Sequence, residues 1–471
     1  MILLVFNPEI INEGLSRNRS LVFSSSAAVC RIFEYYGICD IIKYNVSTKG
    51  WMMMQPENQI KVGIGFATGR KSFQKVLKTY AYNWREGGLT DERKISLNLL
   101  VAYDLQYANT SRTDYTNIHP DVRSFIDEVY FIGRTTLDED ISAMIQAGII
   151  DEIQAKVLFG TGYAAKRNAV LYTALKNKID YLLFLDDDEY PMAVTKTRST
   201  AIWGGQHVLS AHLNIIDQAD ITNGYHCGYI SPIPSIEFND VMTSEIFRQF
   251  IEAISNDIVN WETISSLIES GGVTYADTRI LVSDASEEVP ETNGTKFITG
   301  ANLCINLTKP ERVFPFYNPP GARGEDTFLS TCLHERKVLR VPCYTFHDGF
   351  STYNTLMDGV LPITLKKIDG KNDAVISRFY RTCVGWIRYK PLLLYITQRE
   401  SYRQQIDLIR EKLTLTLPSI CAYFGNNDFM SILKELNRYD KNVQNHYAQF
   451  VETQEIWSRI TSYLQTKPEQ S

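Results

Sequence analysis

Apolar segments alternate with amphipathic segments over residues 60–190. Short apolar runs predict β-strands at four places: 62–66, 96–104, 128–133 and 181–185. Segments with apolar residues at helical spacing lie between them, and Leu171, Leu175 and Ile179 recur every four residues in one of these. Strands that alternate with helices predict an α/β fold built on a mostly parallel sheet.

The strand predicted at 181–185, "YLLFL", contains apolar and aromatic residues only, which is typical of a strand buried on both faces of a sheet. Four acids follow it directly, Asp186 to Glu189. In open sheets of this kind, ligands bind beyond the carboxyl ends of the strands. Carboxylates this close raise one another's pKa unless a cation offsets their charge. We therefore expect a positively charged partner beside these acids.

The length and the pattern predict three parts. At 471 residues the chain is too long for one ordinary core. We expect an N-terminal accessory segment at 1–60, an α/β domain at 61–355 and a helical C-terminal domain at 356–471. Pro391 and Pro418 are predicted to break the helices of the last part.

Composition narrows the class of protein. Hydrophobic residues make up 44% and charged residues 22%, as in soluble globular proteins. A net charge of −6 argues against a nucleic-acid partner. The eight cysteines form no C-x-x-C pair, which favours reduced thiols over a zinc site or a disulfide framework. No apolar run is long enough for a membrane-spanning helix. These features predict a cytoplasmic protein.

The acids and the turn before the preceding helix suit a divalent cation that carries a diphosphate. Carboxylate oxygens suit Mg²⁺ or Mn²⁺, which also bind phosphate oxygens. The turn Gly160-Thr161-Gly162 leads into a predicted helix whose free amide groups favour an anion, and Lys166 and Arg167 add positive charge. The alternative is a solvated acidic loop or an adventitious cation site.

Four motifs occur in the order "GYAAKRNAVLYTAL…YLLFLDDDEYP", "ITGANLCINL", "GARGEDTFLS" and "FHDGF". This order resembles glycosyltransferases of the GT-A fold, in particular the inverting enzymes of family 2, over about residues 61–350. The resemblance implies a Rossmann-like, mostly parallel sheet flanked by helices. It also implies metal-dependent, inverting transfer of a sugar, with hexosyl transfer expected, from a nucleotide sugar to an acceptor hydroxyl in surface polysaccharide or glycoconjugate synthesis.

The resemblance also implies roles for single residues. Asp188 would ligate the metal, Asp186 would contact the metal or the donor ribose, and His347 would complete the metal site. Asp326 would be the catalytic base, with Glu325 as the second candidate. If this segment is extended, the two neighbours cannot both point into the site. A packed core histidine is the alternative for His347.

Contacts to the nucleotide sugar are expected from seven residues: Arg70, Asp104, Lys166, Arg167, Asp186, Asp187 and Asn302. For three of them a simpler interpretation stays open. Asp104 could be a strand-end turn acid, Arg70 a surface arginine, and Asn302 a residue that serves its turn alone.

A UDP-sugar is the first expectation for the donor and a GDP-sugar the second, with a glycan or a lipid-linked molecule as acceptor. Residues 377–399 mix basic and aromatic side chains, which favours peripheral contact with an anionic membrane surface. The alternative is a helix packed against the sheet. Gly385 and Pro391 are predicted to interrupt this helix.

Two other functions remain open on the sequence. A haloacid-dehalogenase-like phosphatase also places D-x-D at a strand end, although its motif comes early in the domain and Tyr190 stands where it has Thr or Val. A catalytically inactive module that binds nucleotide sugars would keep the fold without the chemistry. The acids at 186, 188 and 326 argue against that module.

Overall fold

The computed structural model describes residues 59–89, 95–255, 261–351, 353 and 360–466. Residues 59–471 group as one compact unit. The predicted accessory segment at 1–60 lies outside the described residues, except for its last two positions.

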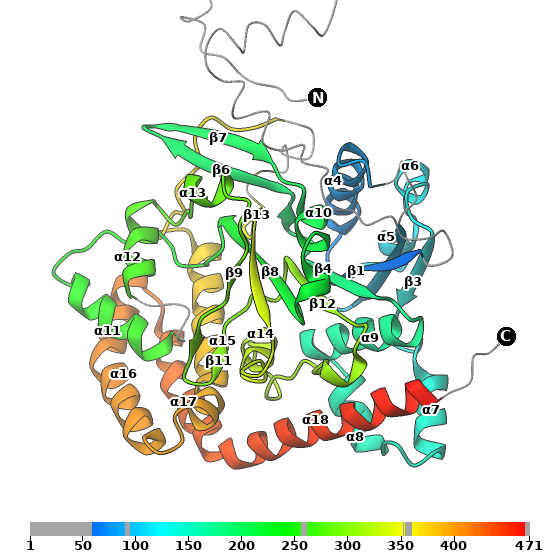
Figure 1. Ribbon diagram of the computed structural model, residues 1–471. Helices are drawn as coiled ribbons and strands as arrows, with labels where there is room; N and C mark the ends of the chain where they lie inside the picture. The colour runs from blue at the N-terminus through cyan, green and yellow to red at the C-terminus, as the bar shows by residue number, and fades with distance from the viewer. Residues whose placement is uncertain (1–58, 90–94, 256–260, 352, 354–359, 467–471) are drawn as a thin grey trace, which may run out of the picture. The chain divides into compact units, whose positions relative to one another are not determined.

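A nine-stranded sheet forms the centre of this unit, with the order β3-β2-β1-β4-β12-β8-β13-β5 and β9 paired to β13 (Figure 1). Its strands are β1 (Ile60–Thr68), β2 (Ile95–Tyr103), β3 (Glu128–Ile132), β4 (Tyr181–Leu185), β5 (Glu189–Tyr190), β8 (Ile221–Gly228), β9 (Glu287–Glu288), β12 (Leu303–Asn306) and β13 (Val338–His347). Strands β1 to β4 are parallel neighbours, and β12 runs antiparallel between β4 and β8. Strand β13 is parallel to β8. The predicted α/β class and mostly parallel sheet are therefore confirmed.

Two short hairpins and the helices complete the described fold. The hairpins are β6 (Met192–Thr197) with β7 (Thr200–Gly205) and β10 (Glu291–Thr292) with β11 (Thr295–Lys296). The α-helices before the C-terminal region are α4 (Phe73–Glu86), α5 (Thr113–Thr116), α6 (Pro120–Arg123), α7 (Asp138–Gln146), α8 (Glu152–Phe159), α9 (Tyr163–Lys176), α10 (Val208–Leu213), α11 (Ser244–Ile254), α12 (Trp261–Glu269), α13 (Thr278–Leu281) and α14 (Glu325–Ser330). The C-terminal helices are α15 (Asp373–Thr397), α16 (Tyr402–Phe424), α17 (Ser431–Lys441) and α18 (Val443–Thr466). Short 3₁₀ turns are η1 (Ile216–Gln218), η2 (Pro310–Arg312) and η4 (Asn427–Met430).

Strand β4 is buried on both faces, as its continuous apolar sequence predicts. Leu183 and Leu185 belong to the hydrophobic cluster that includes α4, whereas Leu182 and Phe184 belong to the cluster that includes α9. All four side chains are fully buried. Since successive side chains of a strand point to opposite faces, both layers of helices hold β4 in place. This fixes the position of the acids that follow it.

The C-terminal helices share a third hydrophobic cluster with α11 and α12, and Figure 1 shows α11, α12, α15, α16 and α17 on the same side of the sheet. The predicted breaks at Pro391 and Pro418 are wrong, because α15 and α16 run through them. A proline inside a helix removes one backbone hydrogen bond. The buried residues around Pro391, such as Ile387 and Leu392, keep the helix continuous through packing.

Helix α15 covers most of the basic and aromatic run at 377–399. Arg388 pairs with Glu435 at 2.8 Å, and the ammonium group of Lys390 donates a hydrogen bond to the buried carbonyl of Ser255. Two of the four basic side chains that α15 contributes to this run are thus used inside the protein. Gly385 does not interrupt the helix either. Within the described part of the chain, no helix combines the length and apolar character needed to cross a bilayer.

Candidate active site

The carboxyl ends of several strands meet at one edge of the sheet. Because β1 lies between β2 and β4 in parallel, Thr68, Asp104 and Asp186 follow neighbouring strands at the same edge. The register of β13 against β5 places His347 opposite Glu189. Asp104, Asp186 and His347 therefore lie at the same edge of the sheet, where the sequence predicts the ligand site.

Arg70 is the positive partner of two of the acids. Its Nη1 lies 2.8 Å from Oδ1 of Asp187 and also contacts Oδ2 of Asp188. The hydroxyl of Thr68 donates a hydrogen bond of 2.5 Å to Asp187. Asp187 is buried and both its oxygens have protein partners. In the structure Asp187 anchors the acidic turn to the end of β1, and its contact with a nucleotide sugar stays a prediction.

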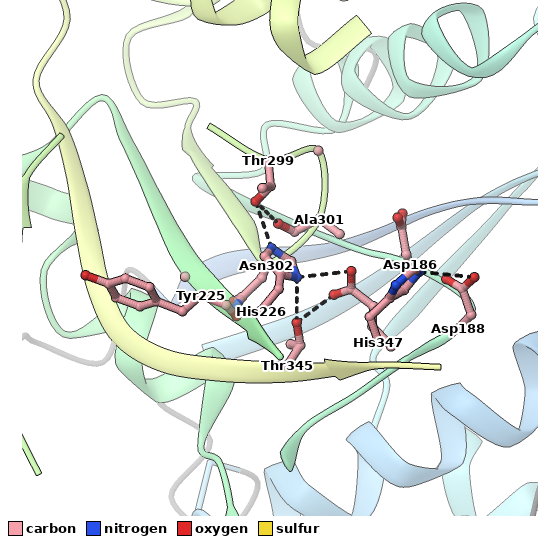
Figure 2. A network of polar contacts seen from close by, with 12 residues as sticks. Asp186, Asp188, Tyr225, His226, Thr299, Ala301, Asn302, Thr345 and His347 are labelled. Atoms are coloured by element: carbon pink, nitrogen blue, oxygen red, sulfur yellow. Dashed lines mark hydrogen bonds and ion pairs between the residues drawn. The ribbon is translucent and has the colours of Figure 1, made fainter. Parts of the chain in front are cut away.

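His347 and Asp188 form a second contact, with 3.4 Å between Nε2 and Oδ2 (Figure 2). Nδ1 of His347 donates to the carbonyl of Tyr229 at 2.7 Å, which directs Nε2 towards Asp188. Burial by itself lowers the pKa of His347, but the charges of Asp188 and Glu189 raise it to about 9. Burial also opposes ionisation of Asp188, yet His347 and Arg70 together hold its pKa below the usual value.

Asp186 has a different partner, and in Figure 2 its carboxylate points away from the contact between Asp188 and His347. Its Oδ1 lies 3.1 Å from Nη2 of Arg167. The side chain of Asp186 keeps 35% of its surface exposed. Burial of the acidic turn raises the pKa of Asp186, and Arg167 opposes this rise.

Arg167 joins three segments that are far apart in the sequence. Besides Asp186, it contacts Glu325 with 3.4 Å between Nε and Oε1, and it donates a hydrogen bond to the carbonyl of Gly300. Its side chain is 3% exposed and lies over the ring of Phe184. Arg167 is thus used by protein groups in this structure, and its contact with a diphosphate stays a prediction.

Asp326 stands beside Glu325 at the start of α14, and both side chains reach the site because the segment is helical, not extended. One carboxylate oxygen of Asp326 accepts a hydrogen bond of 3.1 Å from the backbone N–H of Gly300. Burial and the charge of Glu325 raise the pKa of Asp326 to about 6. Gly324 precedes them with φ of 92°, a conformation that glycine adopts without strain, and turns the chain into this helix.

A network of polar side chains continues from the acidic turn to the loop before β12 (Figure 2). Glu189 accepts a hydrogen bond of 2.7 Å from Thr345 and lies 3.2 Å from Nδ1 of His226. Nε2 of His226 lies 2.8 Å from the hydroxyl of Thr299. Sequence reasoning missed His226 and Thr299, because their partners come from distant elements. The run of four acids was the one available signal for Glu189.

Asn302 is fully buried, and its expected contact with a sugar stays a prediction. Its Oδ1 accepts from Nε2 of His212 at 2.8 Å, and its amide donates to the carbonyl of Tyr225 at 3.1 Å. The φ of Asn302 is 49°, a left-handed conformation that asparagine adopts more readily than most residues. Burial lowers the pKa of His212 to about 4, so this network is neutral. Asn302 thus fixes the loop that contains Gly300.

Asp104 and Lys166 lie on the other side of the acidic turn. Asp104 is half-buried, and its carboxylate accepts a hydrogen bond of 3.0 Å from the backbone N–H of Gln106, as a turn acid does. Burial lowers the pKa of Lys166, and the charge of Asp104 opposes this effect. Gly162, with φ of 102°, begins the helix that positions Lys166. These two side chains remain accessible to a ligand at this end of the site.

An aromatic ring lies at the exposed edge of the site, beside Arg70. Tyr107 is half exposed, its ring lies 5.9 Å from the Cζ atom of Arg70, and it meets Tyr163 edge-on at 6.2 Å. Sequence analysis did not single out either tyrosine, because aromatic residues in a polar loop give no specific signal.

Asp186, Asp188 and His347 are the expected ligands of the metal. Two carboxylates and a ring nitrogen suit Mn²⁺ or Mg²⁺ in their chemistry. Asp188 and His347 are in contact with each other, whereas Asp186 pairs with Arg167 and points away from that contact. Among the described residues, no group of three or more His, Cys, Asp or Glu side chains is arranged to hold a metal. Asp188 and His347 bring two donor atoms to one place, and Arg70 contacts Asp188 there as well.

No protein-family model matches the sequence, and no curated protein matches it significantly. Among solved structures, the chain is similar to the apo crystal structure of mouse xyloside xylosyltransferase 1, with 13% sequence identity and a TM-score of 0.18. The similarity covers 41% of this chain and 58% of that chain. At that identity and TM-score, it carries no argument about the reaction, and the residues of the site have to support a function by themselves.

Proposed function

We propose that this chain is a glycosyltransferase that moves a sugar from a nucleotide-sugar donor, a UDP-sugar first and a GDP-sugar second, to an acceptor hydroxyl. One observation supports this most: Arg167 contacts Asp186, one of the acids that follow β4, and Glu325, one of the two acids at the start of α14. A transferase needs both a site for a leaving diphosphate and a base for the acceptor. The acids after β4 would supply the first and the acids at the start of α14 the second, and Arg167 holds the two groups near each other.

Asp188 and His347 would hold the divalent cation, and Asp186 would contact it or the donor ribose. When bound, such a cation stabilises the negative charge that develops on the leaving nucleotide diphosphate. Arg70 keeps 31% of its side chain exposed beside these acids and would add positive charge for the same diphosphate. Tyr107 offers a flat apolar face next to it, on which a base or sugar ring can stack.

Asp326 would act as the catalytic base. A raised pKa of about 6 makes it a stronger base than an ordinary aspartate while it remains ionised at neutral pH. The hydrogen bond from the N–H of Gly300 orients its carboxylate. In an inverting reaction this group takes the proton of the acceptor hydroxyl as that oxygen attacks the anomeric carbon. Glu325 is the weaker candidate, because Arg167 neutralises it.

The test compares the cleavage of UDP-, GDP- and dTDP-sugars with the cleavage of p-nitrophenyl phosphate, each with and without Mn²⁺. We expect Mn²⁺-dependent turnover of one nucleotide sugar and no turnover of the phosphoester. Phosphoester hydrolysis alone would support a phosphatase instead. Tight binding of a nucleotide sugar without turnover, with a full panel of acceptors present, would identify an inactive binding module. A product that retains the donor's anomeric configuration would contradict the inverting scheme.

A further inference from the structure

A hollow of about 410 Å³ opens at the start of α15, beyond the end of β13. Its wall includes four basic side chains: Lys366, Lys367, Arg378 and Arg381. Asp369 is the one acid of this wall, and its carboxylate accepts a hydrogen bond of 2.9 Å from the backbone N–H of Lys371. The hollow is therefore strongly positive.

The four basic side chains have no carboxylate partner among the described residues. None of them forms an ion pair within 4.0 Å among the residues that the structure describes, although most arginines of the C-terminal helices do. The hollow also lies at the N-terminal end of a 25-residue helix, where the helix dipole is positive. Basic groups gathered without a partner repel one another, and an anion in the hollow would relieve this repulsion.

Arg378 connects the hollow to the candidate active site. Its guanidinium lies over the ring of Phe350, 4.3 Å from the ring centre. A side chain at Gly349 would come within 2.7 Å of the His347 ring and within 2.9 Å of Arg378, so glycine allows these two groups to approach. The charge of Asp188 also acts on Arg378 and opposes the lowering of its pKa by burial. The hollow and the acidic turn are thus neighbours.

The position of the hollow favours the acceptor over the donor. Asp104, directly after β2, and Lys166, in the first turn of α9, are two of the residues from which contacts to the nucleotide sugar are expected. In the sheet order, β13 is separated from β2 by β1, β4, β12 and β8. The hollow follows β13, which lies on the other side of β4 from β2 in this order.

We infer that the hollow binds a phosphate group on the acceptor, so that this enzyme glycosylates a phosphate-bearing molecule. This inference rests on the proposed function. Two lysines and two arginines offer more donors than a single carboxylate can accept, which favours a phosphate group. Phe350, in the same wall, offers an apolar face to the sugar or glycerol unit that carries the phosphate.

The test measures binding of glucose 6-phosphate, glucuronate and glucose by calorimetry to the full chain. We expect glucose 6-phosphate to bind most tightly, and the double variant Lys367→Gln with Arg381→Gln to weaken it roughly tenfold or more. Lys371→Gln is the matched control, because this nearby lysine pairs with Glu237 and does not line the hollow. This control should bind like the unmodified chain.

Other results would overturn the inference. Equal affinity for the three probes, or the same affinity in the double variant, would remove the phosphate site. A loss of UDP binding in the double variant that matches the loss of glucose 6-phosphate binding would assign the hollow to the donor. Because the assay needs no turnover, it separates this inference from the proposed function, which fails if no nucleotide sugar binds.

A second measurement distinguishes a free phosphate from a lipid headgroup. Sedimentation uses neutral phosphatidylcholine vesicles with and without phosphatidic acid. Binding to phosphatidic acid that the double variant loses supports a lipid-linked acceptor. Binding of glucose 6-phosphate without vesicle binding supports a water-soluble one.

Discussion

Arg167 and Glu325 face each other with 3.4 Å between Nε and Oε1, although they belong to motifs that are far apart in the sequence. The same guanidinium holds Asp186 at 3.1 Å. One buried cation therefore sets the distance between the acids that follow β4 and the acids that begin α14. We interpret Arg167 as a positioning residue, because it contacts one acid of each group and its own side chain is buried.

The first prediction concerns the stability that Arg167 supplies. Arg167→Met leaves Asp186 and Glu325 without their shared partner in a mostly buried setting. We expect the free energy of unfolding to fall by about 3–5 kcal/mol, as when one member of a buried ion pair is removed. Urea unfolding followed by circular dichroism measures this. Arg248→Met, which breaks an exposed pair with Glu245, should change the midpoint little. Equal losses in both variants would contradict the role of Arg167.

The second prediction concerns the pH dependence of transfer. The proposed base has to be ionised, and the pKa of Asp326 is raised to about 6. The rate should therefore be constant above this pH and fall as pH drops through about 6. Asp326→Asn should lower the rate by about 10²–10⁴-fold and leave donor affinity nearly unchanged. Rates with saturating donor between pH 5 and 9 test this.

Glu325→Gln is the control for the second prediction. Its loss of rate should be smaller, and a fall in rate on acidification should remain because Asp326 is intact, but it should move to lower pH because the charge of Glu325 no longer raises the pKa of Asp326. A larger loss in Glu325→Gln than in Asp326→Asn would reverse the assignment of the base.

The third prediction concerns the metal. Asp188 and His347 are the two ligands proposed for the cation, with 3.4 Å between Oδ2 and Nε2. Asp188→Asn should abolish Mn²⁺-dependent binding of a nucleotide sugar, and His347→Gln should weaken it, because each removes a ligand. Calorimetry with and without Mn²⁺ measures both. Asp140→Asn, which breaks a pair with Lys176 outside the site, is the matched control. Folded variants that keep full Mn²⁺-dependent affinity would refute the metal assignment.

The part of the fold that depends on local pattern was predictable from the sequence. The boundaries of β4 match the run "YLLFL", because a strand covered on both faces has no polar residue to obscure it. The acids at its end follow from the same logic, since loops at the carboxyl ends of parallel strands form the ligand site. Asp326 was found through its motif, and its raised pKa and its hydrogen bond from Gly300 came from the structure.

The inward or outward direction of polar side chains was not predictable. Arg167 and Asn302 are polar and lie in motifs, yet tertiary partners bury both. Neighbours along the sequence give no indication of these partners, because Gly300 and His212 come from other elements. The predicted break at Pro391 was wrong for a related reason. Packing on both sides of α15 outweighs the local cost of a proline in the helix. Long-range packing therefore decides which polar residues remain for function.

The last prediction separates packing from membrane contact at α15. Arg388 pairs with Glu435 and donates a hydrogen bond to the carbonyl of Gly321, and Lys390 donates to the buried carbonyl of Ser255. Arg388→Gln and Lys390→Gln should each lower the free energy of unfolding by about 1–3 kcal/mol, because each leaves a carbonyl without its donor. Arg381→Gln, at an exposed position of the same helix, should not. Binding to anionic vesicles that weakens with salt, and that both substitutions abolish without a loss of stability, would instead place this helix at a membrane surface.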